Sequence, residues 1–394
     1  MKKVKYLFGL LAFLIATVVF GQKVQIPDFY LEQAIRVHFD KPTGDITKAD
    51  MESLTRFVAV GRNISNIVGL EHAKNLTYLR LDNNTIEDLS PLAKLTSLQI
   101  LGLNGNKIET LDPIKDLTNL KDLSFDRNNI SDISSLRRLR KLRGITGHFN
   151  KIGDISVTKD WKKLTYFNMG FNELNDLSPL KELTRLKGIW VPDNKIDDLE
   201  PLSNLKVLNV LILEKNPIAD ITALKGLTKL VQLNLMDTQI KDFSPLSDLD
   251  QVGVLVLRDN GIEHLDFLEN LINIEWLDLR DNQISDISVL EELPKLKKLF
   301  LSGNSINSIV SLSDKKHLRW LLLENNNIAN IWPLYNLENL TDIMLYNNPL
   351  KDTSDLANTN EAVMNKIKSD GKNITLNSTE INSIYQLEPS KKLK

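Results

Sequence analysis

The sequence contains no cysteine, which excludes disulfides, thiolate metal sites and a lipid-modified cysteine near the N-terminus. It has no excess of positive charge either, since the formal net charge is −2, and nucleic-acid-binding proteins usually need a basic surface that displaces counterions. The dense basic run from Arg137 to Arg143 is more typical of a solvated edge. We therefore expect no nucleic-acid partner.

Catalytic and metal-binding motifs are missing as well. The five histidines are scattered without metal-ligand spacing, and no His-Glu-x-x-His, Gly-x-Ser-x-Gly or phosphate-loop pattern occurs. An enzyme needs acids, bases or ligands that converge on one place. We expect no enzymatic activity, no catalytic residue, no metal and no cofactor.

Long apolar runs are scarce, and the one at the N-terminus has a distinctive context. The run from Tyr6 to Phe20 follows Lys2, Lys3 and Lys5 and precedes Gly21. This pattern is typical of a secretory signal peptide, and the run is too short to span a bilayer together with its flanks. A buried N-terminal helix or a membrane anchor is the alternative. We expect residues 1–21 to be cleaved, which predicts a secreted or cell-surface chain without a transmembrane segment.

The sequence is rich in one repeat, L-x-x-L-x-L-x-x-N-x-I-x-D-I-x-P-L-x-x-L. Its asparagine recurs every 22 residues, and Thr238 stands in one of these positions. A period of this length with this pattern indicates leucine-rich repeats. The asparagines form a structural ladder at Asn84, Asn106, Asn128, Asn150, Asn172, Asn194, Asn216, Asn260, Asn282, Asn304, Asn326 and Asn348.

Each position of the repeat has a physical reason. The L-x-L alternation predicts a short strand with leucines pointing inward, and stacked copies make one parallel sheet. The asparagine amide can bond backbone groups of its own and the neighbouring turn, so Thr238 should mark a weaker turn. Asp, Ser and Pro in the return segment favour a short 3₁₀ turn. Turn chemistry also explains the row of aspartates at 88, 132, 154, 176, 198, 220, 242, 286 and 352 better than a cation-binding stripe does.

One core irregularity suggests compensation. Gly147 stands where other repeats have an inward leucine, while the neighbouring repeats place Phe125 and Met169 at that position. We expect these larger side chains to fill the missing volume.

The ends of the array differ from the repeat, as solenoid caps must. Helices are predicted around residues 27–35 and from Thr47 onward, and another around residues 360–369 before a last strand at residues 374–376. The predicted organisation is a signal peptide (1–21), a helical N-terminal cap (22–53), 22-residue repeats (54–352), a C-terminal cap (353–378) and a polar tail (379–394). The fold class is thus an α/β leucine-rich-repeat solenoid, with a curved parallel β-sheet and 3₁₀ turns on its convex side.

These residues resemble the internalin-type leucine-rich-repeat proteins of bacteria. The likeness rests on the cap from Ile26 to Ile35, the helix that precedes Leu54, and the Asp-Ile-Ser-Pro-Leu returns, and it covers residues 26 to about 376. It implies a right-handed solenoid whose concave sheet binds protein ligands. The sequence departs from the family because it lacks two features, an immunoglobulin-like domain after the repeats and a Leu-Pro-x-Thr-Gly sorting signal, so we do not expect covalent attachment to a cell wall or a role in host invasion.

The concave face is the candidate binding surface. Residues six, four and two places before each asparagine should point outward, and in the C-terminal half they are rich in tryptophan and other apolar types that the core does not require. His148 also falls there, as a contact residue rather than a catalyst. The candidate ligand-binding residues are Trp190, Ile212, Val254, Val256, Trp276, Arg258, Arg280, Phe300, Trp320, Leu322, Met344 and Tyr346.

Several alternatives remain open from the sequence. The exposed aromatic residues could pack only on each other, Arg258 and Arg280 could pair with neighbouring aspartates, and aromatic rings could stack on a glycan. The leading interpretation is an adhesion-like recognition protein, monomeric, with a protein or glycan ligand. Two other functions remain as alternatives. The protein could be an envelope scaffold that associates with itself, or an intracellular repeat protein of the phosphatase-regulator kind if the leader is not a signal peptide.

Overall fold

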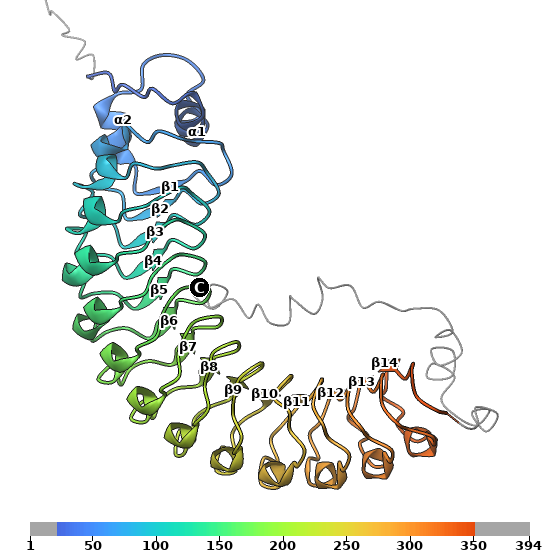
Figure 1. Ribbon diagram of the computed structural model, residues 1–394. Coiled ribbons are helices and arrows are strands. Elements are labelled where there is room, and N and C mark those ends of the chain that lie inside the picture. Colours follow the sequence, from blue (N-terminus) through green and yellow to red (C-terminus); the bar gives the residue numbers. More distant parts are fainter. Residues whose placement is uncertain (1–21, 351–394) are drawn as a thin grey trace, which may run out of the picture.

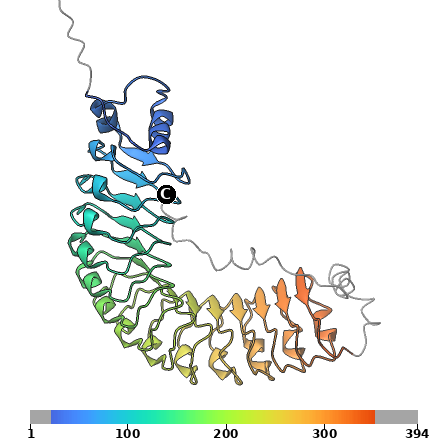
Figure 2. The same ribbon diagram turned by 45° about the horizontal axis from the view of Figure 1, so that its top comes forward.

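Residues 22–350 form one continuous curved solenoid in the computed structural model (Figure 1). Fourteen strands form a single parallel sheet in which each strand pairs with the next one in sequence. The strands line the inner side of the curve and the short coiled turns lie on its outer side (Figure 2). The predicted solenoid fold is confirmed. The predicted signal peptide, C-terminal cap and tail lie outside the described residues.

Every strand is three residues long and matches the L-x-L part of one repeat. In β2, Leu79 points into the core and is fully buried, while Tyr78 and Arg80 point outward. The strands are β1 (Arg56–Val58), β2 (Tyr78–Arg80), β3 (Ile100–Gly102), β4 (Asp122–Ser124), β5 (Gly144–Thr146), β6 (Tyr166–Asn168), β7 (Gly188–Trp190), β8 (Val210–Ile212), β9 (Gln232–Asn234), β10 (Val254–Val256), β11 (Trp276–Asp278), β12 (Lys298–Phe300), β13 (Trp320–Leu322) and β14 (Asp342–Met344).

The convex side consists of short 3₁₀ turns, as the sequence predicts. In many of them a proline occupies the first or second position, where its fixed φ suits the turn and its missing N–H costs nothing. The turns are η1 (Leu70–His72), η2 (Ser90–Leu92), η3 (Asp112–Ile114), η4 (Ser134–Arg138), η5 (Ser156–Asp160), η6 (Ser178–Leu180), η7 (Glu200–Leu202), η8 (Thr222–Leu224), η9 (Ser244–Leu246), η10 (Asp266–Leu268), η11 (Ser288–Glu292), η12 (Val310–Leu312) and η13 (Trp332–Leu334).

The row of aspartates serves these turns. The carboxylate of Asp88 accepts the N–H of Ser90 at 2.7 Å and also its hydroxyl at 2.7 Å. The same bond to the backbone two residues later recurs at positions 132, 154, 176, 198, 220, 242 and 286. The predicted turn role is confirmed at these positions, and Asp352 lies outside the described residues.

Two helices, α1 (Phe29–Phe39) and α2 (Lys48–Ser53), close the N-terminal end of the core. The side chain of Asp28 accepts the N–H of Leu31 at 2.9 Å as the cap of α1, and its other oxygen accepts the N–H of Ser65 at 2.8 Å. Thr47 and Asp50 form a capping box at the start of α2, the helix predicted from Thr47 onward. Asp28 therefore ties the cap to the first turn of the array. Between residues 22 and 350, no helix is long and apolar enough to cross a bilayer.

The asparagine ladder holds successive turns together. The Asn106 side-chain oxygen accepts the N–H of Ile86 at 3.0 Å, and its amide donates to the carbonyls of Leu81 at 3.1 Å and Leu103 at 2.9 Å. One buried side chain thus satisfies backbone groups of two turns that would otherwise be unpaired, which costs about 1 to 3 kcal/mol for each such group. The amide pattern recurs at the other ladder asparagines from Asn84 to Asn348.

Thr238 weakens this ladder as expected. Its hydroxyl and N–H both donate to the side-chain oxygen of Asn260, at 2.6 and 3.0 Å, and within residues 22–350 that oxygen accepts no bond from the N–H of Ile240. In most other repeats the N–H of the residue after the asparagine donates to the preceding turn, as that of Lys107 does to the carbonyl of Ile86 at 3.0 Å. Within the described residues Gly261 forms no such bond to Ile240.

The core compensation at Gly147 is confirmed. A Cβ built on Gly147 would collide with the ring of Phe125 and lie 2.8 Å from the sulfur of Met169. Both of these side chains are fully buried. Their bulk therefore occupies the space that a leucine fills in other repeats.

The first test of the fold is Gly147→Leu. The new side chain has no free volume, so we expect a loss of about 1 to 3 kcal/mol in the free energy of unfolding, measured by urea denaturation. The matched control is Phe125→Leu combined with Gly147→Leu, which should recover part of the loss. A single variant that is as stable as the parent would contradict the packing argument.

The second test is Thr238→Asn. An asparagine can donate to the carbonyls of Leu213 and Leu235 in the way that every other ladder asparagine bonds its two turns. We expect a gain of about 1 kcal/mol in the free energy of unfolding. The reciprocal variant Asn194→Thr should lose at least as much, and a loss in both variants would show that the turn around Thr238 has adapted to threonine.

Candidate functional site

The concave face carries three columns of outward side chains, aligned by the register of the parallel strands. Each strand pairs with its neighbour at a 22-residue offset, so Trp276, Lys298 and Trp320 lie side by side in one column. Adjacent strands are about 4.8 Å apart, which brings neighbouring side chains of a column into contact. The chemistry of this face therefore depends on which residues succeed one another along a column.

An apolar cluster covers the concave side of β10 to β14. It consists of Trp276, Phe300 and Leu322 with Val254, Trp320 and Met344 packed against them, and it is separate from the interior core. The rings of Trp276 and Phe300 meet edge to face, with centroids 6.0 Å apart. The predicted apolar stretch thus exists as a packed unit on the outer side of the sheet.

The predicted exposure of these residues is wrong for several of them. We expected open side chains, but the close spacing of the strands lets bulky neighbours cover one another. Trp190, Val254, Trp320 and Met344 are half-buried, and Tyr346 is 46% exposed. The candidates that are buried instead are Ile212 (8% exposed), Val256 (2%), Trp276 (8%), Phe300 (3%) and Leu322 (3%).

Lys298 lies between the two tryptophans of its column. Its ammonium nitrogen is 5.0 Å from the ring centroid of Trp276 and 4.4 Å from that of Trp320. Cation–π attraction holds the charge there, and partial burial lowers the pKa of Lys298. The cluster thus includes one positive charge in an apolar setting.

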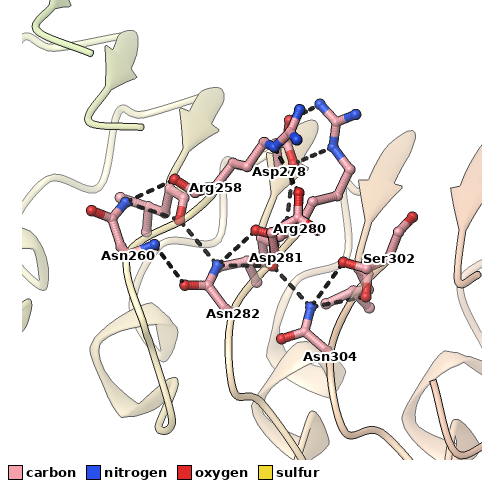
Figure 3. Close-up of polar contacts among 11 residues, drawn as sticks. Arg258, Asn260, Asp278, Arg280, Asp281, Asn282, Ser302 and Asn304 are labelled. Atoms are coloured by element: carbon pink, nitrogen blue, oxygen red, sulfur yellow. Dashed lines mark hydrogen bonds and ion pairs between the residues drawn. The ribbon is translucent and has the colours of Figure 1, made fainter. Parts of the chain in front are cut away.

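The two predicted arginines are engaged in ion pairs within the face (Figure 3). The Arg280 guanidinium donates to both carboxylate oxygens of Asp278, at 2.9 and 2.6 Å, and Asp278 is fully buried. Arg258 pairs with Asp281 across the neighbouring strand at 2.8 Å. The structure therefore shows the alternative in which both arginines pair with neighbouring aspartates. These ion pairs lie at the edge of the apolar cluster.

The N-terminal half of the face is more polar and includes partly buried acids. Burial raises the pKa of Asp126 and of Glu214. The N–H of His148 donates to Asp126 at 2.9 Å, and the side-chain amide of Asn234 donates to Glu214. These acids are held by neighbours on the sheet and carry a desolvation cost when charged.

A second aromatic group was missed by the sequence reasoning. Phe149 and Phe171 occupy the place directly before the ladder asparagine, outside the three strand columns, and their rings stack with centroids 4.2 Å apart. The ring of His148 stands edge-on against both. The available signal was two phenylalanines at a position that is otherwise polar or glycine.

No metal centre is found within residues 22–350, where no group of three or more potential ligands converges. His148 lies on the concave face as expected, and burial lowers its pKa. Of the basic run from Arg137 to Arg143, Arg137 pairs with Asp160 at 3.0 Å and Arg138 with Asp116 at 2.6 Å. The arrangement offers contact surfaces rather than a convergent set of acids and bases.

Glu214→Gln tests the electrostatics of the face. A raised pKa in the folded state means that the folded protein binds more protons than the unfolded chain, so stability falls as the pH rises through the raised pKa. Glutamine still accepts the amide of Asn234 and carries no charge. We expect the variant to be more stable than the parent at about pH 8, with a difference that shrinks toward about pH 4. Denaturant unfolding at both pH values measures it, and a difference that does not change with pH would contradict the assignment.

Comparisons with known proteins agree with this architecture. A family model described as leucine-rich repeats (2 copies) matches residues 74–116, 96–138 and 272–314. No curated protein matches the sequence. The structure of the plant peptide hormone receptor RGFR1, solved in complex with RGF2, has a TM-score of 0.65 at 18% identity, covering 78% of this chain and 54% of that one, which is a likeness of fold alone.

Two solved bacterial structures are more similar in sequence. Internalin C2 from Listeria monocytogenes is 32% identical, with a TM-score of 0.51 over 52% of this chain and 93% of that one. The internalin InlF from the same organism is 33% identical, with a TM-score of 0.79 over 82% of this chain and 96% of that one. This identity over nearly the whole of InlF, together with the helical cap and the unbroken 22-residue array, shows that the chain belongs to the internalin family of leucine-rich-repeat proteins.

Proposed function

We propose that this chain is an exported or cell-surface recognition protein that binds a protein ligand on the concave side of β10 to β14. The observation that carries the proposal is the apolar cluster around Trp276 and Trp320, which lies outside the core and faces the inside of the curve. Core packing does not need it, because the inward positions of the same strands are filled by buried leucines such as Leu277 and Leu321. Apolar groups gathered on an outer face are typical of interaction sites.

The packing of the cluster favours tight recognition. Trp276, Phe300 and Leu322 are held in place by their neighbours, so a ligand would not have to order them on binding. The more open members, Trp320 and Met344, with exposed Tyr346 beside them, would supply the contact area. Tryptophan and tyrosine are the residues most often found at binding hot spots.

The surroundings of the cluster are polar, as at protein interfaces. The Arg280–Asp278 and Arg258–Asp281 ion pairs lie on one side of it, and Lys298 lies within it. A polar rim around an apolar centre is the usual anatomy of such a surface. We favour a protein ligand over a glycan, because a sugar would need an open ring face and Trp276 is 8% exposed.

We propose that the protein is exported because of the sequence of residues 1–21. The basic start and the apolar run from Tyr6 to Phe20 are typical of a signal peptide. Adhesion is the role we propose for the exported protein. The plant receptor with the same fold, which was solved with its peptide ligand RGF2, supports the use of such a scaffold for peptide or protein recognition.

The binding site is tested with Trp276→Ala and Trp320→Ala combined. The parent, immobilised, should capture a ligand from extracts of host cells or of the bacterial envelope, and the double variant should bind that ligand at least about tenfold more weakly, because hot-spot truncations cost about 2 kcal/mol or more. The matched control is Trp332→Ala, since Trp332 is 47% exposed on the convex turn η13.

Three outcomes would contradict the proposal. Equal capture by the double variant would place the site elsewhere on the chain. Loss of binding after treatment of the ligand with glycosidases, but not with proteases, would indicate a glycan. Self-association of the parent in light scattering, abolished by the double variant, would indicate a scaffold that binds its own kind.

A further inference from the structure

The position before each ladder asparagine has a backbone conformation that limits the residue type. In the repeats from Asn83 to Asn347 this residue has a φ between 50° and 70°, the left-handed region that side chains with a Cβ rarely adopt. Asparagine, aspartate and glycine tolerate it best. They fill most of the repeats, at positions 83, 105, 193, 237, 259, 281, 303, 325 and 347.

Arg127, Phe149, Phe171 and Lys215 depart from this preference, and the two phenylalanines are the apolar ones among them. Their φ values are 55° and 54°, and a bulky side chain in this conformation costs about 1 to 2 kcal/mol. Two phenylalanines in consecutive repeats therefore lower the stability of the fold, because asparagine would adopt this backbone conformation with less strain. Strained residues of this kind gather at functional sites.

The surrounding residues are arranged to hold the two rings. The rings stack at 4.2 Å with planes 20° apart, and His148 braces both, with ring centroids at 4.6 and 4.9 Å. A Cβ on Gly170 would lie 2.6 Å from the ring of His148, so only glycine leaves room for this brace. Phe149 remains 39% exposed. The pair is therefore a fixed apolar ridge at the edge of the concave face.

The ridge has a positive and a negative end. Arg127 occupies the same position as Phe149, directly before the ladder asparagine, one repeat earlier. Its guanidinium lies 5.1 Å from the ring centroid of Phe149. Exposed Asp193 follows Phe171. Asp126, beside Arg127, is bonded to the backbone of His148. The edges of aromatic rings are themselves electropositive, so the Arg127 end favours a carboxylate.

We infer that Arg127, Phe149 and Phe171 form a second docking site, which binds a protein segment carrying a carboxylate next to an apolar side chain. The carboxylate pairs with Arg127, and the apolar side chain packs on the ridge. Asp193 repels an acid at the other end and so sets the direction of the segment. The site uses no residue of the apolar cluster and is independent of the function proposed above.

A sugar fits this ridge less well than a peptide. One face of the Phe149 ring lies against Phe171, and the guanidinium of Arg127 lies over the ring. A sugar stacks on an open ring face, whereas an apolar side chain can pack along ring edges. The charge at Arg127 and the apolar edges beside it therefore match a peptide.

The experiment is selection of a random peptide display library on the immobilised full chain, followed by titration of the enriched peptides. We expect enriched peptides with an aspartate or glutamate beside a phenylalanine, leucine or isoleucine. Phe149→Asn with Phe171→Asn should weaken them at least about tenfold. Asparagine already occupies this position at Asn83, Asn325 and Asn347, so the variant should unfold at the same or a higher temperature than the parent.

Charge reversal gives the matched second arm. Selection on Arg127→Glu should replace the acid of the enriched peptides by lysine or arginine at the same place. Trp276→Ala with Trp320→Ala should leave the peptides bound, which separates this site from the apolar cluster. The inference would be overturned by enriched peptides that carry no acid, or by peptides that bind the double asparagine variant as well as the parent. It would also be overturned if no peptide depended on Phe149 and Phe171 for its enrichment, or if a uronic-acid oligosaccharide were the only ligand whose binding depended on these two rings.

Discussion

The bond from each ladder asparagine to the neighbouring turn is the constraint on which the rest of this protein depends. A buried amide such as that of Asn106 satisfies carbonyls of two turns and an N–H of the preceding turn. A slip of one residue would leave these groups unpaired, at a cost that a three-residue strand could not offset. The ladder therefore fixes the 22-residue step, and the step aligns the columns of the concave face. Binding surfaces in this fold are built by the choice of residues along columns, with the backbone held constant.

The same spacing explains why the apolar cluster is packed rather than open. Parallel strands about 4.8 Å apart leave too little room for a tryptophan and a phenylalanine on adjacent strands to stand free. They cover each other, so Trp276 and Phe300 support the more exposed Trp320 and Met344. A surface of this kind loses little side-chain entropy on binding. The curvature presents it to the inside of the arc, where a ligand can contact several strands at once (Figure 2).

Local chemistry could be predicted from the sequence, and side-chain burial on the outer face could not. The strands and the aspartate turns follow from patterns within one repeat, so the sequence predicts them correctly. The burial of Trp276 depends on Lys298 and Phe300, which are 22 and 24 places away, and a single repeat does not reveal them. The sequence leaves open whether Arg280 contacts a ligand or forms an ion pair, and the structure shows the ion pair with Asp278. Phe149 and Phe171 do not follow from the strand pattern, because they lie at the turn position directly before the asparagine, which also reaches the face.

Strain distinguishes the two surfaces physically. Residues of the apolar cluster lie on regular strands and stabilise one another, so truncating them removes favourable packing as well as any ligand contact. Phe149 and Phe171 instead hold a conformation that their side chains disfavour, and replacing them with asparagine relieves it. The two surfaces thus differ in what points to a ligand: the apolar cluster lies outside the core that the fold needs, whereas the ridge residues hold a strained backbone. Strain at the ridge beside Arg127 therefore adds an argument for a function beyond stability that the apolar cluster lacks.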